Sequence, residues 1–222
     1  MNKLSKRLQV IADYIEDNSK IVDIGCDHGL LSIYLANKYD NIKIIASDVN
    51  SNALSSAISN IKNSGLSDRI ETRLGNGLDV INYHEIDTIV IAGMGSNTIV
   101  EILKFSNDKL KNVNSIIVQS NTDLYFLRKN IVILGYYIED EVLVEDKNII
   151  YTIIKFRKGK KKYSYKELYL GPILIKNNDN LFKKKCNKEY ITMKKILDNI
   201  NKGHYIYKLK IKKNINILKH FL

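Results

Sequence analysis

The chain has 222 residues, 45% of them hydrophobic, and carries 35 Lys and Arg against 24 Asp and Glu, a formal net charge of +11. This size fits one well-buried domain with an appendage of about 60 residues and leaves no room for a second full-sized core. No apolar run approaches the roughly 18 residues of a membrane-spanning helix, and the N-terminus lacks the apolar segment of a secretory signal, so we expect a cytoplasmic protein with no membrane partner.

The first predicted element is an amphipathic helix. Leu4, Leu8, Ile11 and Ile15 recur at the three- and four-residue spacing of a helix. Their spacing places one apolar face against the rest of the domain.

Strands and helices then alternate along the chain. We expect strands at 20–25, 42–47, 69–74, 87–91 and 115–119, helices at 29–38, 51–64, 96–105 and 122–134, and a closing antiparallel strand pair at 136–145 and 149–157. Asn50 or Ser51, and Ser96, are predicted to cap the helices that follow them. Strands separated by helices form a parallel sheet with covered faces. The order of these elements predicts an α/β fold with the Rossmann-like sheet of the class I methyltransferases, which depend on S-adenosylmethionine (SAM).

A glycine turn at residues 23–29 follows the first strand. Gly25 and Gly29 remove side chains where the backbone must approach a ligand closely. The spacing is not G-x-G-x-x-G, which argues against a dinucleotide and favours S-adenosylmethionine (SAM), whose linkage has no phosphate for the helix end to hold.

Four side chains of this turn are candidates for the cofactor site. Asp23 and Asp27 are predicted to engage the ammonium group of the methionine moiety, because a carboxylate and an ammonium favour each other's charged forms. Cys26 is predicted to line the cofactor loop. His28 either shapes the site or has a structural role.

The ends of the second and third strands add further candidates. Asp48 is placed to accept hydrogen bonds from the ribose hydroxyls, with Val49 beside it, although an acid there also suits a helix N-terminus. Asn76, followed by Gly77, is placed to accept from the adenine amino group, although Gly-Asn-Gly alone describes a tight turn.

The acceptor side is predicted at the ends of the fourth and fifth strands. Ala92, Gly93 and Met94 present bare backbone and one adaptable apolar side chain, instead of the Asp/Asn-Pro-Pro-aromatic motif of many nucleic-acid amino methyltransferases. Gln119 and Asn121 supply amides that donate and accept toward a base edge, with turn capping as the alternative.

Positive charge is concentrated in the last third of the chain. Residues 155–222 hold 20 Lys and Arg and 4 Asp and Glu (20 − 4 = +16), whereas residues 1–154 hold 15 and 20 (15 − 20 = −5). A biased base composition alone would not confine the excess to one end, so we expect a polyanion-binding segment. Apolar stripes at 182–200 and 207–222, with a turn at 201–203, predict two helices packed as an antiparallel hairpin.

With these motifs together, the chain resembles the bacterial tRNA (adenine-22-N1)-methyltransferases, the TrmK family. The matching residues are 4–8, 23–25, 27–28, 75, 77–78, 91–95, 119, 121 and 170–172, ahead of a basic tail. The resemblance implies methylation of adenine N1 in the D-arm region of tRNA, with S-adenosyl-L-homocysteine as the other product. It implies a SAM-binding Rossmann-like domain at 1–158 and a basic, coiled-coil-like tRNA-binding domain at 159–222.

The resemblance also assigns roles to residues. It implies a cofactor pocket from Asp23, Gly25, Asp27, His28, Gly77, Ala92 and Gly93, and an acceptor side from Gln119 and Asn121. Two positions depart from the family pattern: Asn76 stands where an acid is expected, and Ser120 where a proline is expected, which leaves that loop less rigid.

We expect direct methyl transfer without a general base, because neutral adenine N1 already has a lone pair. Asp27 is predicted to stabilise the cationic product, and the target base to be extruded from the folded tRNA. The candidate RNA contacts, each alternatively a solvated helix face, are Lys6, Arg7, Lys160, Lys161, Lys162, Lys183, Lys184 and Lys185.

The residues also bear on metal binding, partners and alternative functions. Cys26 and Cys186 lie far apart without a metal-binding pattern, so neither a disulfide framework nor a metal site is predicted. No obligate protein partner is inferred. The alternatives are a SAM-dependent methyltransferase acting on another RNA or a small molecule, a non-catalytic RNA- or protein-binding module of the same fold, and, more distantly, a nicotinamide dehydrogenase.

Overall fold

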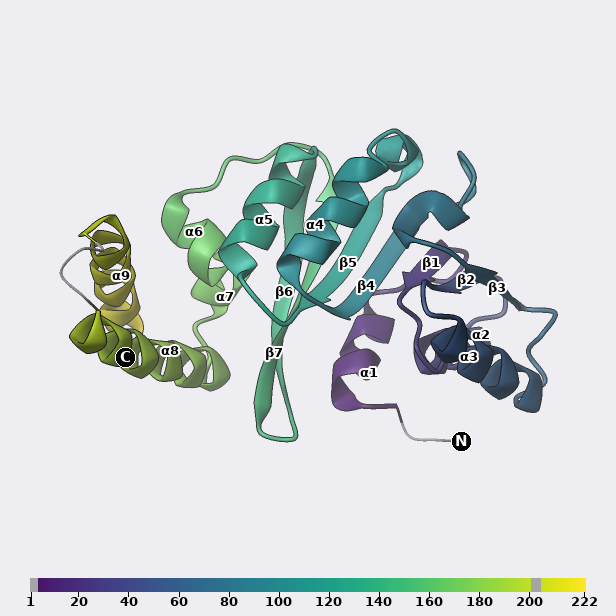
Figure 1. The fold of residues 1–222 in the computed structure, drawn as a ribbon, viewed down its shortest axis with the longest axis horizontal. Helices are drawn as coiled ribbons and strands as arrows, with labels where there is room; N and C mark the ends of the chain where they lie inside the picture. The colour runs from purple at the N-terminus through teal and green to yellow at the C-terminus, as the bar shows by residue number, and fades with distance from the viewer. Residues whose placement is uncertain (1–3, 201–204) are drawn as a thin grey trace. The chain divides into compact units, whose positions relative to one another are not determined.

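The computed structural model describes residues 4–200 and 205–222 (Figure 1). The chain divides into two compact units, with the boundary between Lys162 and Tyr163 in the sequence. The first unit contains every strand of the described chain, and the second is helical. The domain roles assigned from the sequence stay predictions.

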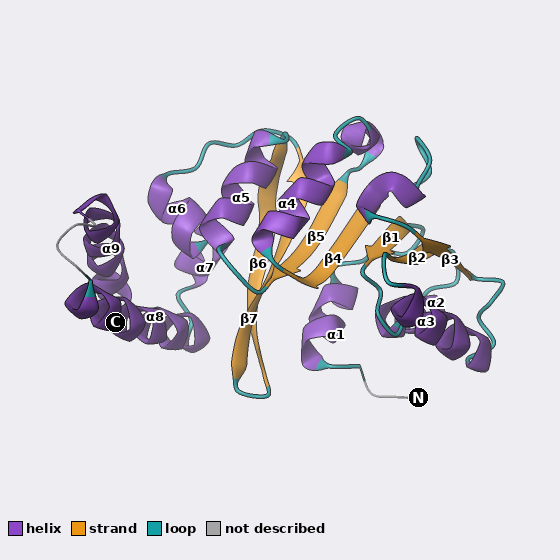
Figure 2. Ribbon diagram, in the orientation of Figure 1, coloured by secondary structure: helices purple, strands orange, loops and turns teal. Residues whose placement is uncertain are grey.

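The first unit is built on one seven-stranded sheet (Figure 2). Its strands are β1 (Lys20–Ile24), β2 (Lys43–Asp48), β3 (Ile70–Leu74), β4 (Thr88–Met94), β5 (Ser115–Ser120), β6 (Tyr136–Asp146) and β7 (Ile149–Lys158). They lie in the order β3-β2-β1-β4-β5-β7-β6, with β1 to β5 parallel and β7 antiparallel to both β5 and β6. This confirms the predicted class I methyltransferase sheet.

Helices cover the sheet as the alternation of elements predicts. The first unit contains α1 (Lys6–Asp13), α2 (Leu30–Lys38), α3 (Ser51–Asn63), α4 (Ser96–Phe105), α5 (Leu124–Ile133) and the 3-10 turns η1 (Gly77–Val80) and η2 (Lys109–Asn112). The first three helices share one buried cluster with alternate strand residues such as Ile21, Ile44 and Val90. Burial of these apolar faces is the main stabilising contribution to the unit.

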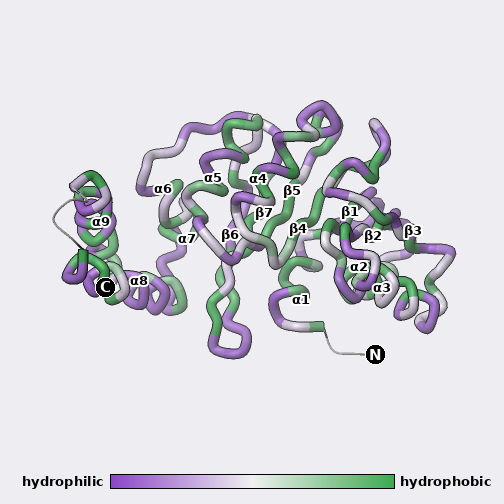
Figure 3. Tube along the Cα trace, viewed as in Figure 1, coloured by the Kyte–Doolittle hydropathy of each residue, from purple (hydrophilic) through white to green (hydrophobic). Residues whose placement is uncertain are grey.

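Hydropathy follows this layering. Figure 3 shows hydrophobic segments along the central strands β4 and β5, and hydrophilic residues at the turn between β6 and β7. In the described ranges, no helix combines the length and apolar character needed to cross a membrane.

One predicted helix cap is confirmed and one is wrong. The Asn50 side chain accepts hydrogen bonds from the amides of Asn52 (2.9 Å) and Ala53 (3.2 Å) and caps α3. Ser96, in contrast, is already the first residue of α4, with Gly95 at the cap position. Its buried hydroxyl instead bonds the Ser120 hydroxyl (2.9 Å), because the end of β5 lies beside it.

The second unit consists of helices. They are α6 (Tyr165–Leu170), α7 (Pro172–Asn177), α8 (Asn180–Asn199), α9 (Tyr205–Leu218) and the turn η3 (Lys219–Phe221). The first two were not predicted, although Ser164 and Glu167 form a capping box that signals the start of α6.

Helices α8 and α9 pack together, as predicted. Phe182, at the start of α8, lies edge-on to Phe221, with 5.3 Å between the ring centroids. Tyr207 and Leu222, which we predicted in the buried stripe, are at least half exposed, because burial is concentrated around Phe182 and Leu218. The predicted turn at 201–203 lies outside the described residues.

Candidate active site

The carboxyl ends of β1, β2, β4 and β5 surround a cavity of about 520 Å³. Parallel strands bring their carboxyl ends to one edge of a sheet, which is where ligands bind in such folds. The cavity is lined by Arg7, Leu8, Asp23, Gly25, Cys26, Asp27, His28, Leu30, Leu31, Asp48, Ala92, Gly93, Met94, Asn121 and Tyr151. Most of the predicted cofactor residues therefore lie together.

The glycine turn has the conformation that its sequence requires. Gly25 has φ +72°, and a Cβ added there would collide with the end of the Met94 side chain, which also lines the cavity. Gly29 has φ +69° and opens α2, with Ala57 3.2 Å from the position of a Cβ. Because L-residues rarely adopt such φ values, both positions favour glycine.

Asp23 is the buried carboxyl of the site. It is 4% exposed and accepts a hydrogen bond from the Ser32 hydroxyl at 3.0 Å. Burial raises its pKa to about 6, the nearby Asp48 charge adds to that rise, and the Ser32 bond opposes it. A cation bound in the cavity would favour the ionised form of Asp23.

Asp48 is held in place by two backbone amides. Its Oδ2 accepts from the Asp27 amide at 3.2 Å and its Oδ1 from the Asn50 amide at 2.8 Å. Asp27 and His28 lie on the exposed rim, with 3.6 Å between Asp27 Oδ1 and His28 Nε2. Three carboxylates consequently face one cavity, and this arrangement attracts a cationic ligand.

Four predicted cofactor residues do not line this cavity. Asn76 and Gly77 line a separate cavity beside α4, and the Gly75 amide ties that loop to the Asp48 carbonyl at 3.1 Å. Val49 is 69% exposed and lines neither cavity. Gly29 lies behind the turn, against α3. Their contacts with the cofactor stay predictions.

The two amides after β5 have different surroundings. Gln119 is fully buried, and its Nε2 donates to Asn121 Oδ1 at 2.9 Å. Asn121 is exposed to the cavity, and its Nδ2 donates to the Gly93 carbonyl at 2.8 Å. A β-bulge in β4 makes that carbonyl available, because the register with β5 shifts between Ala92 and Met94.

Two residues that sequence reasoning did not place in this site contribute to it. Arg7, predicted as an RNA contact, reaches in from α1 and donates through Nη1 to Gln119 Oε1. Its guanidinium lies 5.4 Å from the ring centroid of Tyr151. Tyr151 is near the start of β7, and only the antiparallel direction of that strand brings its beginning to this edge of the sheet.

The candidate RNA contacts are dispersed. Lys6 is exposed on α1, and Lys160, Lys161 and Lys162 are exposed beyond the end of β7, at the opposite end of that strand from Tyr151. In α8, Lys183 and Lys184 are exposed and Lys185 is half-buried. Their contacts with RNA stay predictions.

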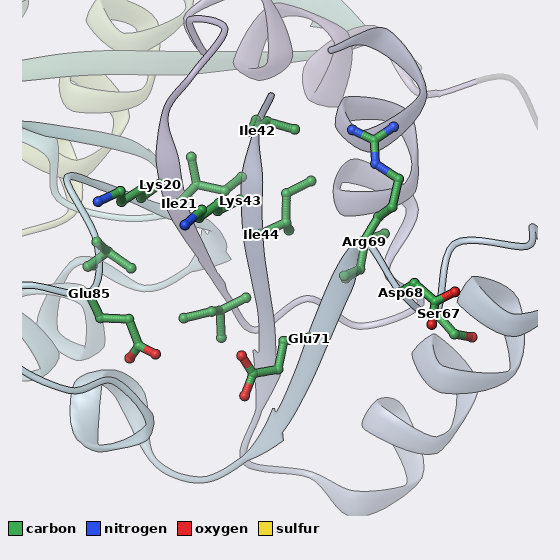
Figure 4. A pocket seen from close by; sticks show the side chains of 13 residues that line it. Lys20, Ile21, Ile42, Lys43, Ile44, Ser67, Asp68, Arg69, Glu71 and Glu85 are labelled. Atoms are coloured by element: carbon green, nitrogen blue, oxygen red, sulfur yellow. The ribbon is translucent and has the colours of Figure 1, made fainter. Parts of the chain in front are cut away.

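Another cavity lies at the amino ends of β1 to β3, opposite the glycine turn (Figure 4). It is lined by residues of both charges, including Lys20, Lys43, Glu71 and Glu85. Arg73 binds both of these glutamates, and its hydrogen bond is the main cause that lowers the pKa of Glu85 to about 2. No predicted site residue lines this cavity, and among the residues that the structure describes no cluster of three potential metal ligands is found.

The chain is similar to proteins of known sequence and structure over nearly its whole length. Residues 21–221 match the sequence model described as TrmK: tRNA (adenine(22)-N(1))-methyltransferase. The tRNA (adenine(22)-N(1))-methyltransferase of Bacillus subtilis is 33% identical over 207 residues, which cover 90% of this chain and 87% of the relative.

The chain is also similar to solved structures over nearly its whole length. TrmK of M. capricolum in complex with S-adenosyl-homocysteine has a TM-score of 0.87 and 32% identity, covering 98% of this chain and 97% of that one. A Streptococcus pneumoniae protein solved in complex with S-adenosyl-L-methionine has a TM-score of 0.91 and 30% identity, covering 99% and 100%.

Proposed function

The chain belongs to the TrmK family and is a SAM-dependent tRNA (adenine(22)-N(1))-methyltransferase, and from this premise we propose how its own residues carry out the reaction. The observation that carries the proposal is that Asp23, the glycine turn, Asp48 and Asn121 converge on one cavity at the carboxyl edge of the sheet. The tRNA substrate makes the cytoplasm the expected place of action.

The residues of the cavity fit the cofactor. A Cβ at Gly25 would overlap the Met94 side chain, so glycine lets the turn and Met94 lie close together where both line the cavity. Asp23 is a buried carboxyl that gains from a bound ammonium group, and Asp48 is oriented by two amides for diol recognition. When bound, SAM supplies a methyl group activated by its sulfonium.

The acceptor needs no proton removal. The adenine N1 lone pair forms the new N–C bond as the S–C bond breaks, and the base becomes a cation. The chain contributes by holding the base in line for this displacement. Asn121 faces the cavity to contact the base, and the exposed Asp27 carboxylate is the proposed stabiliser of the developing positive charge.

Base extrusion is the expected route to the site. Adenine in a folded tRNA is stacked or paired, and extrusion costs a few kcal/mol, which phosphate contacts offset. The basic segment at 159–222 is the proposed source of those contacts because it carries most of the positive charge.

The test uses the purified chain, SAM and unmodified tRNA, with no second protein. Mass spectrometry of the digested product should find N1-methyladenosine, and a tRNA with guanosine at position 22 should remain unmethylated. Methylation of a different base or of a small molecule would replace this assignment. No methylation despite SAM binding would favour the non-catalytic module.

A further inference from the structure

The hydrogen bonds around Asn121 run in one direction. Arginine can only donate, so Gln119 must turn its oxygen toward Arg7 and its nitrogen toward Asn121. At the other end, the Gly93 carbonyl can only accept, so Asn121 must turn its nitrogen toward Gly93. Both amide orientations are therefore determined by groups that have no alternative role.

This chain of bonds defines what Asn121 offers to a ligand. Its Oδ1 accepts one bond from Gln119 and keeps a second lone pair, and its Nδ2 donates one proton to Gly93 and keeps a second. Asn121 is exposed and lines the cavity, whereas Gln119 is fully buried. Asn121 thus keeps one acceptor and one donor, on the two polar atoms of one amide, for a ligand in the cavity that it lines.

We propose that Asn121 recognises the N6/N7 edge of the target adenine, and that Arg7, acting through Gln119, is the positioning residue that sets this orientation. The proposal rests on the function proposed above and names the edge of the base that is read. Asn Oδ1 accepts from the adenine N6 amino group while Nδ2 donates to N7, the bidentate geometry by which asparagine reads adenine in nucleic acids.

The choice of edge follows from the chemistry. N1 must face the methyl group, so N1 cannot also serve as a hydrogen-bond acceptor for the protein. The N6/N7 edge is the remaining side of adenine with an adjacent donor and acceptor. Guanine presents two acceptors, O6 and N7, at the same edge and would place O6 against Asn121 Oδ1. The arrangement therefore selects adenine over guanine.

Tyr151 supports Arg7, the first residue in this series of hydrogen bonds. The Arg7 guanidinium lies over its ring at 5.4 Å, and Gly93 leaves room for Arg7, since a Cβ there would lie 3.2 Å from Nη1. A long side chain from α1 is thereby held inside the cavity instead of extending into solvent.

The test compares full-length tRNA carrying adenosine at position 22 with the same tRNA carrying 7-deazaadenosine, which keeps N1 and N6 but lacks N7. Under single-turnover conditions the deaza substrate should react about 10-fold more slowly with the wild-type chain, because one Asn121 donor is left unpaired. Asn121→Ala should react equally slowly with both. Asn121→Asp, which keeps the acceptor and loses the donor, should also give a ratio near one between the rates on the adenosine and 7-deazaadenosine substrates.

Arg7→Met should lower the rate of methyl transfer. It should also bring the ratio of the rates on the adenosine and 7-deazaadenosine substrates toward one. Arg7→Lys, which keeps a donor-only group, should restore part of that ratio. Lys43→Met removes the same charge at the opposite edge of the sheet (Figure 4) and should leave the ratio at the wild-type value.

Equal wild-type rates on the two substrates would overturn the N6/N7 contact, even while N1-methyladenosine forms and the proposed function holds. If Asn121→Ala kept the wild-type ratio between the rates on the two substrates, the contact would also be overturned. The slower reaction of the 7-deazaadenosine substrate would then come from a change in the RNA and not from Asn121. If Arg7→Met weakens only tRNA affinity and its salt dependence while keeping the wild-type ratio, Arg7 is a phosphate contact and its positioning role is rejected.

Discussion

At the scale of single residues, we expect the buried Asp23 carboxyl to link protonation to cofactor binding. Its pKa is raised to about 6, mainly by burial, so in the free protein it contributes full stability below the ordinary aspartate pKa near 4 and loses that contribution as pH rises through 6. A bound ammonium group reverses the preference, because it stabilises the carboxylate. Cofactor binding should therefore release a proton at low pH.

We expect SAM affinity to fall about tenfold for each pH unit below 6, the slope for one linked proton. Titration calorimetry between pH 5 and 8 measures this. Asp23→Asn should bind SAM weakly at pH 8 and show little of the slope. If the SAM affinity of the wild-type protein did not change between pH 5 and 8, the predicted contact between Asp23 and the ammonium group would be wrong.

Gly25 and Gly65 offer a matched pair, because both have φ near +70° but only Gly25 would place a Cβ against another side chain. Each substitution to alanine should cost about 1 kcal/mol of stability from backbone strain. Only Gly25→Ala should also weaken SAM binding, since its methyl group would displace Met94, which lines the cavity. Equal SAM affinity in the two variants, measured by calorimetry, would argue against ligand contact at Gly25.

At the scale of elements, α5 is joined to β6 by a buried ion pair. Arg128 Nε and Glu141 Oε1 are 2.5 Å apart, and both side chains are fully buried. Removing one partner leaves a buried charge without its counterion, whereas replacing both by apolar residues of similar size does not. The pair therefore ties the orientation of α5 to the edge of the sheet.

Arg128→Met should lower the free energy of unfolding by about 3–5 kcal/mol, and Arg128→Met with Glu141→Leu should recover most of that loss. Urea denaturation followed by circular dichroism measures both. Arg157→Met provides the control, because Arg157 pairs with Glu139 at a partly exposed position and should cost no more than about 1 kcal/mol. Equal losses in the single and double variants would show that packing, and not the lone charge, sets the cost.

At the scale of the whole molecule, the positive charge of residues 155–222 is the predicted source of tRNA affinity. Replacing Lys160, Lys161 and Lys162 together by glutamine should weaken tRNA binding and lower the slope of log K against log salt by about one for each lost phosphate contact. SAM affinity should not change. Filter binding at several salt concentrations tests this, and an unaltered slope would remove these lysines from the interface.

Much of the site was predictable because it depends on local rules. The strand, glycine turn and helix at residues 20–38 are encoded by apolar runs and by glycines at positive φ, and Asp23, Gly25 and Cys26 line the cavity. Asp48 and Asn121 followed because Asp48 is the last residue of the parallel strand β2 and Asn121 directly follows the parallel strand β5.

The remaining features depend on contacts between residues distant in sequence. Arg7 was predicted as an RNA contact, with a solvated helix face as the alternative. In the structure α1 packs beside β7 and directs Arg7 onto Gln119, 112 positions away. The capping role of Ser96 failed for a similar reason, because its hydroxyl bonds Ser120 at the end of β5 and the Asp123 carbonyl beyond it.

By itself, the sequence determined the order of the elements, the class of sheet, the glycine turn and the concentration of charge, because each depends on local spacing and composition. Only the tertiary structure decided that Gln119 is buried while Asn121 faces the cavity, and that Arg7 and Tyr151 join them. The physical reason is that hydrogen-bond direction and burial are properties of packed neighbours, and strand pairing brings those neighbours together from opposite ends of the domain.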